Sequence, residues 1–170
     1  SVQSFKRQRL AEAGLEPPAN LHFVPVDFAQ EGLDIGLARS AYDLQVPTFF
    51  GWLGVLPYLT RDVVFCTLRA IRYVAAPGSQ LVFDYLDLDA FNAEEVSQPI
   101  QEMLMHIRRH IGESVSTGLD SYTLGTELAR VGFHLRENLS PQEIETRYFQ
   151  GRTDGYHAAE HFHFAWAVVE

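Results

Sequence analysis

Disulfide chemistry, nucleic-acid binding and membrane insertion each require residues that this chain has in short supply. Cys66 is the single cysteine among 170 residues, which excludes an internal disulfide and suits a reducing cytoplasm. Lys and Arg total 13 against 22 Asp and Glu, giving a formal net charge of −9. This acidic balance argues against a nucleic-acid partner, because affinity there comes mainly from phosphate neutralisation. No run approaches the ~20 apolar residues of a membrane-spanning helix and no signal peptide is visible, so we expect a cytoplasmic protein without a membrane partner.

Apolar residues, by contrast, make up 46% of the chain, which is enough for one domain with a real core. Short runs rich in Val, Phe and Leu alternate with helix-like segments, a pattern typical of buried parallel strands joined by crossover helices. The predicted strands are residues 22–26, 48–53, 80–85, 133–139 and 161–169. The predicted helices are residues 4–13, 33–42, 61–75, 99–111, 121–131 and 141–149.

Two local signals sharpen these boundaries, and one residue is assigned to the core. Thr60 is predicted to cap the helix that follows it. Ser140 to Glu143 has the form of a capping box with proline at the first helical position. Cys66 lies in the run VVFCTLRAI and is predicted to be a small buried residue.

The ends of three predicted strands carry the residues that could bind a ligand. Asp27 and Asp84 each end an apolar run, and Gly54 with Tyr58 follows another. In open α/β sheets ligands bind beyond the carboxyl ends of the strands. We therefore expect these residues to face one crevice.

Five segments of the chain carry a resemblance to a known family. They read, in order, FKRQRLAEAG, VPVDF, FFGWLGVLPYLT, PGSQLVFDY and RYFQGRTDG. Together they resemble the S-adenosylmethionine (SAM)-dependent O-methyltransferases of the leucine carboxyl methyltransferase-like family. The resemblance runs from about Ser4 to the end of the chain. It implies an α/β, class I methyltransferase-like (Rossmann-like) fold, with a mostly parallel sheet and flanking helices.

The resemblance also shows what is missing. The family begins with a strand and a glycine-rich turn that holds SAM, followed by a strand with an acidic end, yet no Gly-x-Gly follows a strand here. Residues 1–170 are therefore expected to form a single partial SAM-methyltransferase domain without its first strands. Residues of about 87–118 correspond to an insertion that covers the substrate in the family, and are expected to act as a lid.

The cofactor-binding candidates come from this resemblance. Asp27 and Phe28 are assigned to adenine, because a carboxylate can accept from the amino group while an apolar side chain covers the ring. The alternative for Asp27 is a helix cap. Trp52, Leu53 and Gly54 would lie along the sulfonium side of SAM, where glycine lets backbone approach the ligand. Many relatives carry glutamate in place of Leu53, which removes a polar contact.

The substrate-side candidates lie further along the chain. Tyr58 is the candidate catalytic residue, expected to face the methyl-transfer zone, with packing under the next helix as its alternative. Asp84 and Tyr85 could line the substrate side, or Asp84 could cap local backbone. Tyr148 and Arg152 lie in the last matching segment, and Arg152 suits a carboxylate-bearing substrate. Its alternative is a surface ion pair with Asp154.

The histidines invite a metal hypothesis that we do not adopt. His106 and His110 have helical spacing but lack the glutamate of HExxH, and His161 and His163 share one face of a predicted strand. No cysteine or carboxylate is placed by the sequence to complete a site. A metal-dependent hydrolase is therefore the weakest of the functions considered.

The favoured function is transfer of a methyl group from SAM to an oxygen of a small-molecule acceptor, in secondary metabolism. A carboxylate acceptor is mildly favoured, because it needs no base and the sequence shows no His–carboxylate pair. The alternative is a non-catalytic remnant that serves as a binding or assembly domain. A sheet without its first strands would expose an edge, which predicts a homodimer or strand swap.

Overall fold

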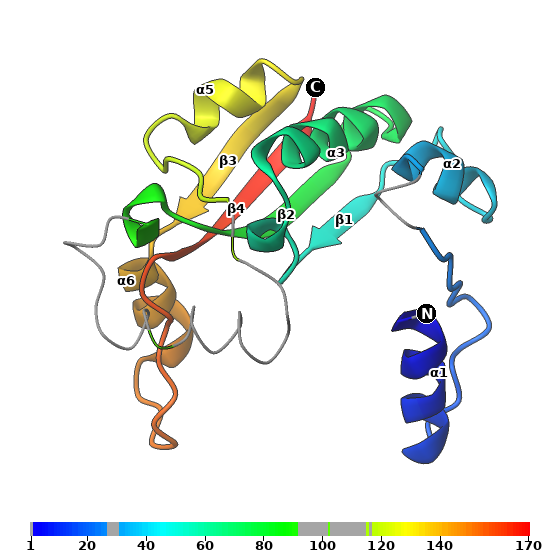
Figure 1. Cartoon of the computed structure of the whole chain (residues 1–170), viewed down its shortest axis with the longest axis horizontal. Coiled ribbons are helices and arrows are strands. Elements are labelled where there is room, and N and C mark those ends of the chain that lie inside the picture. The colour runs from blue at the N-terminus through cyan, green and yellow to red at the C-terminus, as the bar shows by residue number, and fades with distance from the viewer. Residues whose placement is uncertain (1, 27–30, 92–101, 103–114, 116) are drawn as a thin grey trace.

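The computed structural model describes residues 2–26, 31–91, 102, 115 and 117–170, and within them a four-stranded sheet (Figure 1). The strands are β1 (Phe49–Trp52), β2 (Gln80–Leu86), β3 (Phe133–Leu139) and β4 (Phe162–Val169). Their order across the sheet is β1-β2-β4-β3. β1 pairs in parallel with β2, and β4 runs antiparallel between β2 and β3.

The expectation of a mostly parallel sheet is correct for strand directions and wrong for strand pairs. β1, β2 and β3 run the same way, because β2 and β3 both oppose β4. Two of the three described pairs are nevertheless antiparallel. The reason is the connection after β3, which turns the chain back so that β4 lies beside β3 and runs in the opposite direction.

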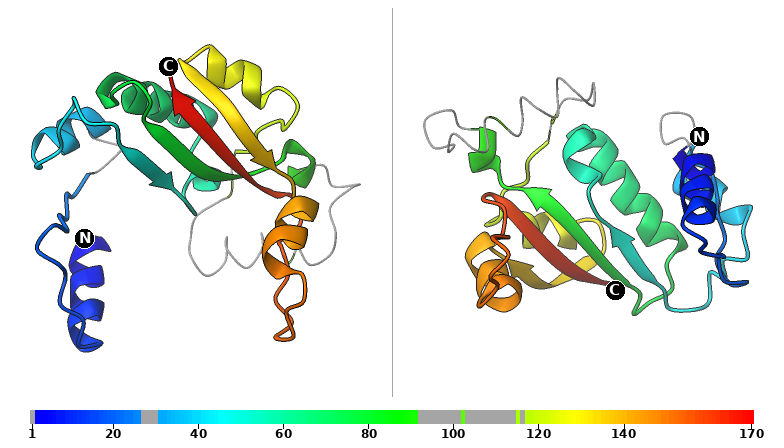
Figure 2. Two further views of the ribbon diagram at one scale, coloured as in Figure 1. Left: turned by 180° about the vertical axis from the view of Figure 1, so that it is seen from behind. Right: turned by 90° about the horizontal axis from the view of Figure 1, so that it is seen from below.

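Helices α3 (Arg61–Val74) and α5 (Leu124–Ala129) cover one face of this sheet (Figures 1 and 2). Thr60 caps α3 as predicted, its hydroxyl oxygen accepting from the Val63 N–H at 3.5 Å. The helix buries side chains at the i, i+3, i+4 and i+7 spacing of one helical face. With α5 and alternate residues of β2 and β4 they form the core, whose members include Val64, Leu68, Ile71, Leu81, Phe83, Tyr85, Leu124, Leu128, Ala165 and Ala167.

The remaining elements include the predicted helices at 4–13 and 141–149, which agree within two residues, and the predicted helix at 33–42, which ends four residues early. They are α1 (Val2–Glu12), α2 (Leu33–Ala38), η1 (Leu56–Tyr58), η2 (Leu88–Phe91), α6 (Pro141–Ile144) and η3 (Glu145–Phe149). The capping box at Ser140 is present in both directions. α5 is shorter than predicted, because Asp120 accepts from the Tyr122 N–H at 2.8 Å and holds the preceding residues in a turn. α1 stands apart from the sheet in Figures 1 and 2.

Two predictions are wrong. Residues 22–26 form no strand, because no described strand lies beside them to exchange backbone hydrogen bonds; the Val24 carbonyl instead accepts from Gln3 Nε2 at 2.6 Å. Cys66 is exposed. It lies between Val64 and Thr67, which are buried, and points away from the apolar stripe of α3.

Several expectations are not decided by the described residues. The predicted helix at 99–111 and most of the lid at about 87–118 lie outside them, as do His106 and His110. The outer edge of β1 has no strand partner within the described sheet, and dimerisation through it stays a prediction. In the described part of the chain, no helix has the length and apolar character to span a membrane.

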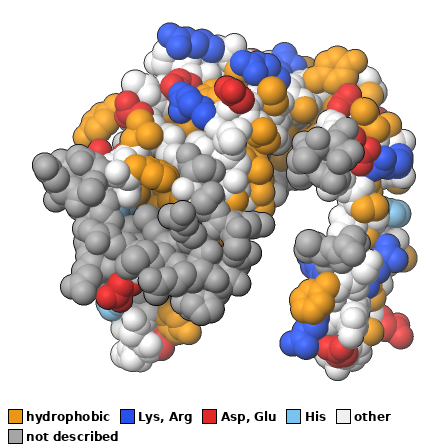
Figure 3. Space-filling view, in the orientation of Figure 1, with side chains coloured by type: hydrophobic (Ala, Val, Ile, Leu, Met, Phe, Trp, Pro, Cys, Tyr) orange, Lys and Arg blue, Asp and Glu red, His pale blue; other side chains and the backbone are white. Residues whose placement is uncertain are grey.

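The second face of the sheet is only partly covered. Val82, Phe164 and Trp166 point away from α3 and α5, and with Tyr148 and Phe149 of η3 they line an apolar cavity of about 500 Å³. Trp166 keeps 38% of its surface exposed. Figure 3 draws the molecule in the orientation of Figure 1, and hydrophobic side chains (orange) are exposed among the charged ones on that side.

Candidate functional site

A backbone turn tied to a buried carboxylate lies where β1 ends. Gly54 adopts a φ of 68°, in the left-handed region that favours glycine. Its N–H donates to Asp84 Oδ1 at 2.7 Å, across from β1 to β2. Asp84 is only 9% exposed. Gly54 and Asp84, two of the residues expected to face one crevice, are therefore joined at the strand ends, and Asp84 takes the backbone-holding role given as its alternative.

The buried carboxylate has a pKa set by its environment. Burial raises the pKa of Asp84 above its ordinary value, and the hydrogen bond from Gly54 opposes that rise. The native state therefore holds the Asp84 proton more tightly than the unfolded chain does. Stability conferred by the protonated form is lost as the pH rises from the ordinary aspartate value through the raised one.

Two substitutions at Asp84 are expected to have opposite effects. Asp84→Asn keeps an oxygen to accept from Gly54 and removes the buried charge, so stability at neutral pH should be unchanged or higher. Asp84→Ala leaves the Gly54 N–H unpaired and should lower the free energy of unfolding by about 1–3 kcal/mol. Urea unfolding between about pH 4 and pH 7 measures both. Equal losses in the two variants would contradict this account.

The other candidates around the turn differ in exposure. Trp52 is half-buried, with its ring 6.4 Å from that of Phe83. Leu53 is 54% exposed, so an apolar surface borders the turn. Tyr58 ends η1 and is half-buried, and the Tyr58 N–H donates to the Val55 carbonyl at 3.1 Å. A methyl group added at Gly54 would meet no atom within 4 Å, so the space beside the turn is open. Asp27 and Phe28 lie outside the described residues.

Tyr85 lies inside the hydrophobic core and not on the surface of the protein, where a substrate could reach it. It has no exposed area, its hydroxyl donates to Asn138 Oδ1 at 2.9 Å, and its ring stacks on His163 with centroids 5.1 Å apart. Burial raises the pKa of the Tyr85 hydroxyl. We therefore assign Tyr85 to holding neighbouring strands together and leave it out of the proposed substrate contacts.

Tyr148 lies on η3, over the second face of the sheet, and Arg152 lies in the segment that follows η3. Arg152 forms a two-bond ion pair with Asp154, with Nε and Oδ1 at 3.0 Å, and lies beside the rings of Phe149 and Tyr156. Both side chains are well exposed. The surface pair given as the alternative for Arg152 is thus the observed arrangement, and Tyr148 lines the apolar cavity of that face.

One pair of titratable groups was missed from the sequence. His163 Nε2 of β4 lies 3.8 Å from Asp87 Oδ2, which follows β2. The strand pairing brings them together, and nothing local in either segment indicates that β2 and β4 are neighbours. Within the described ranges no group of three or more His, Cys, Asp or Glu side chains is placed to hold a metal ion.

Comparisons with known proteins agree with the resemblance of the sequence. Residues 1–72 match the family model of leucine carboxyl methyltransferase. The chain is 31% identical over 168 residues to a Bacillus subtilis protein named "Putative S-adenosyl-L-methionine-dependent methyltransferase YktD", covering 99% of this chain and 55% of that protein. A similarly named protein of Mycolicibacterium gilvum is 36% identical over 110 residues, covering 59% of this chain and 34% of the relative.

The chain is leucine carboxyl methyltransferase-like. It spans about half the length of YktD and about a third of the Mycolicibacterium relative.

Solved structures place this leucine carboxyl methyltransferase-like chain in the expected α/β, class I methyltransferase-like fold class. A Thermobifida fusca protein named "putative methyltransferase" is similar with a TM-score of 0.63 and 18% identity, over 98% of this chain and 59% of that one. Mitomycin 7-O-methyltransferase MmcR is similar with a TM-score of 0.54 and 14% identity, over 96% of this chain and 38% of that one. At these identities the likeness concerns the fold.

Proposed function

We propose that this chain contributes to a SAM-dependent methyltransferase that transfers a methyl group to an oxygen of a small molecule. The observation that carries the proposal is the Gly54 turn, held open beside the end of β1 by the buried Asp84. Relatives named as SAM-dependent methyltransferases support the cofactor, and the O-methyltransferase named among the structural neighbours supports the oxygen target.

The residues present fit one side of such a cofactor. SAM supplies an electrophilic methyl group on a sulfonium when bound. Gly54 would give the ligand close access to backbone, and Leu53 and Trp52 would supply apolar contact next to it. Asp27 and Phe28 are assigned to adenine on the resemblance of the sequence. Tyr58 stays the candidate to face the reacting groups, where holding acceptor and methyl in line gives most of the rate.

Calorimetric titration of S-adenosylhomocysteine tests the proposal. We expect saturable binding to this chain, and about tenfold or greater weakening in Asp27→Ala, because one hydrogen bond to a charged acceptor is lost. Asp62→Ala removes an exposed carboxylate from α3 and serves as the matched control, with binding unchanged. Equal losses in both variants would reject the adenine role of Asp27. Absence of any heat would show that this chain does not bind the cofactor by itself, and the same titration on any longer product of the gene would then separate a missing part of the site from a binding or assembly domain.

A further inference from the structure

Thr117 is a buried polar residue that contacts the backbone on both sides of Tyr58. It is 4% exposed. Its N–H donates to the Pro57 carbonyl at 3.3 Å, and its hydroxyl donates to the Leu59 carbonyl. One residue, 58 positions beyond Leu59 in the sequence, thus holds the carbonyls immediately before and after Tyr58. A change at Thr117 would therefore reach Tyr58 through the backbone.

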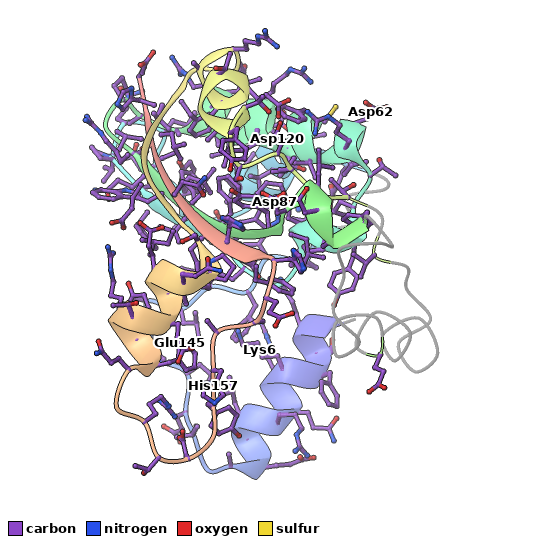
Figure 4. The ribbon with its side chains drawn as sticks, turned by 90° about the vertical axis from the view of Figure 1, so that its left-hand side faces the viewer. Lys6, Asp62, Asp87, Asp120, Glu145 and His157 are labelled. Atoms are coloured by element: carbon purple, nitrogen blue, oxygen red, sulfur yellow. The ribbon has the colours of Figure 1, made fainter. Side chains whose placement is uncertain are left out.

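The segment that carries Thr117 is itself fixed to the end of β2. The Leu119 N–H donates to the Leu86 carbonyl at 2.9 Å. Leu86 and Leu119 have no exposed surface. Figure 4 labels Asp87 and Asp120, which follow Leu86 and Leu119 where the two segments meet. Thr117 is therefore held in place by the sheet and not only by the turn that it contacts.

The neighbouring Gly118 leaves this segment little room to adjust. A Cβ atom added at Gly118 would lie 2.8 Å from Phe91 Cε2 and 3.2 Å from the Asp87 carbonyl oxygen. The backbone at Gly118 thus packs directly against η2 and the residue that follows β2. A closely packed support of this kind holds the groups bonded to it in one geometry.

The connection from β1 to α3 is thus held from the end of β2 at two points. At the first, Asp84 of β2 accepts from the Gly54 N–H. At the second, residues 117–119 join the end of β2 to the backbone around Tyr58. Leu56 lies between these points and has no exposed surface. Each point fixes one residue assigned to the cofactor or the reacting groups, where small displacements have large effects on rate.

We propose that Thr117 is a positioning residue of the methyl-transfer site, which sets the place of Tyr58 through the two carbonyls beside it. The inference rests on the proposed function, in which Tyr58 faces the reacting groups. Thr117 takes no part in the chemistry itself, because its hydroxyl is buried and donates to the Leu59 carbonyl. Loss of that hydroxyl would remove one of the two bonds, so the turn would shift and the site would bind its ligand less tightly.

Thr117→Val and Thr117→Ser test the proposal in calorimetric titrations of S-adenosylhomocysteine. Valine has nearly the shape of threonine without the hydroxyl, and should weaken binding about threefold or more. Serine keeps the hydroxyl and should bring affinity back to within about twofold of the unchanged chain. Thr67→Val is the matched control. Thr67 is also buried and its hydroxyl donates to the Val63 carbonyl at 2.9 Å, but within α3, so affinity should stay unchanged.

Hydrogen exchange of the Tyr58 amide supplies a second readout, which does not depend on the ligand. We expect faster exchange in Thr117→Val than in Thr67→Val, because the bond that Thr117 makes to the turn is lost only in the first. Unchanged exchange at Tyr58 in Thr117→Val would overturn the proposal.

The titrations can overturn it independently. Unchanged affinity in Thr117→Val, equal losses in the Thr117→Val and Thr67→Val variants, or a serine variant as weak as the valine variant would each do so. Failure of the proposed function would differ from these outcomes, since the unchanged chain would then show no binding. The exchange measurement would still decide whether Thr117 holds the backbone around Tyr58.

Discussion

Phe83→Ala is expected to lower the free energy of unfolding by about 3–5 kcal/mol, because it removes a large side chain from the middle of the core. Phe83 has no exposed surface and lies on β2 facing α3. Its ring is 6.1 Å from that of Tyr85 and 6.4 Å from that of Trp52. At about 2–4 °C per kcal/mol for a chain of this size, the midpoint of thermal unfolding should fall markedly.

Phe5→Ala is the matched control for this core variant. It makes the same change on α1, where Phe5 is 64% exposed, and should cost less than about 0.5 kcal/mol. Urea unfolding followed by circular dichroism measures both free energies. Similar losses at the two positions would show that the sheet and α3 do not form the stabilising core of the chain in solution.

Gly54→Ala is expected to reduce affinity for S-adenosylhomocysteine about tenfold or more, equal to about 1.4 kcal/mol. The added methyl group would project into the open space beside the turn, where the proposed cofactor approaches. It would also force alanine into the left-handed conformation at a φ of 68°, costing roughly 1–2 kcal/mol of stability. A loss of binding could therefore have two causes.

Gly151→Ala separates them. Gly151 has a φ of 83° and open space beside it, so alanine there carries the same kind of strain. Gly151 lies after η3, whereas the Gly54 turn follows β1. Calorimetry should show reduced binding in Gly54→Ala alone, while thermal unfolding shows a similar loss of stability in both. Equal binding losses in both variants would show that Gly54 is merely a structural glycine.

Local signals were enough to predict much of the fold. The capping box at Ser140, the cap at Thr60 and the strand 133–139 depend on neighbours within a few residues, and all three are present. A general rule about strand ends predicted that Asp27, Gly54, Tyr58 and Asp84 face one crevice. The structure joins Gly54 to Asp84 by a hydrogen bond, and the shared crevice stays a prediction because Asp27 lies outside the described residues.

Features that depend on distant pairing were harder to predict. The run at residues 22–26 has the composition of a strand, but a strand also needs a partner for its backbone, and the described sheet offers none beside it. The sequence likewise showed no His–carboxylate pair, because Asp87 and His163 meet only through the pairing of β2 with β4. The roles of Asp27, Phe28 and Tyr58 stay predictions.

The central position of β4 has a consequence for how the chain is made. β4 follows both β2 and β3 in the sequence, yet it lies between them in the sheet and supplies Ala165, Ala167 and Val169 to the core. A ribosome delivers β2 and β3 first, and neither can pair with the other in this arrangement. A nascent chain would therefore hold two strands with unsatisfied edges until β4 emerges, and it would depend on chaperones most in the interval between the synthesis of β3 and that of β4.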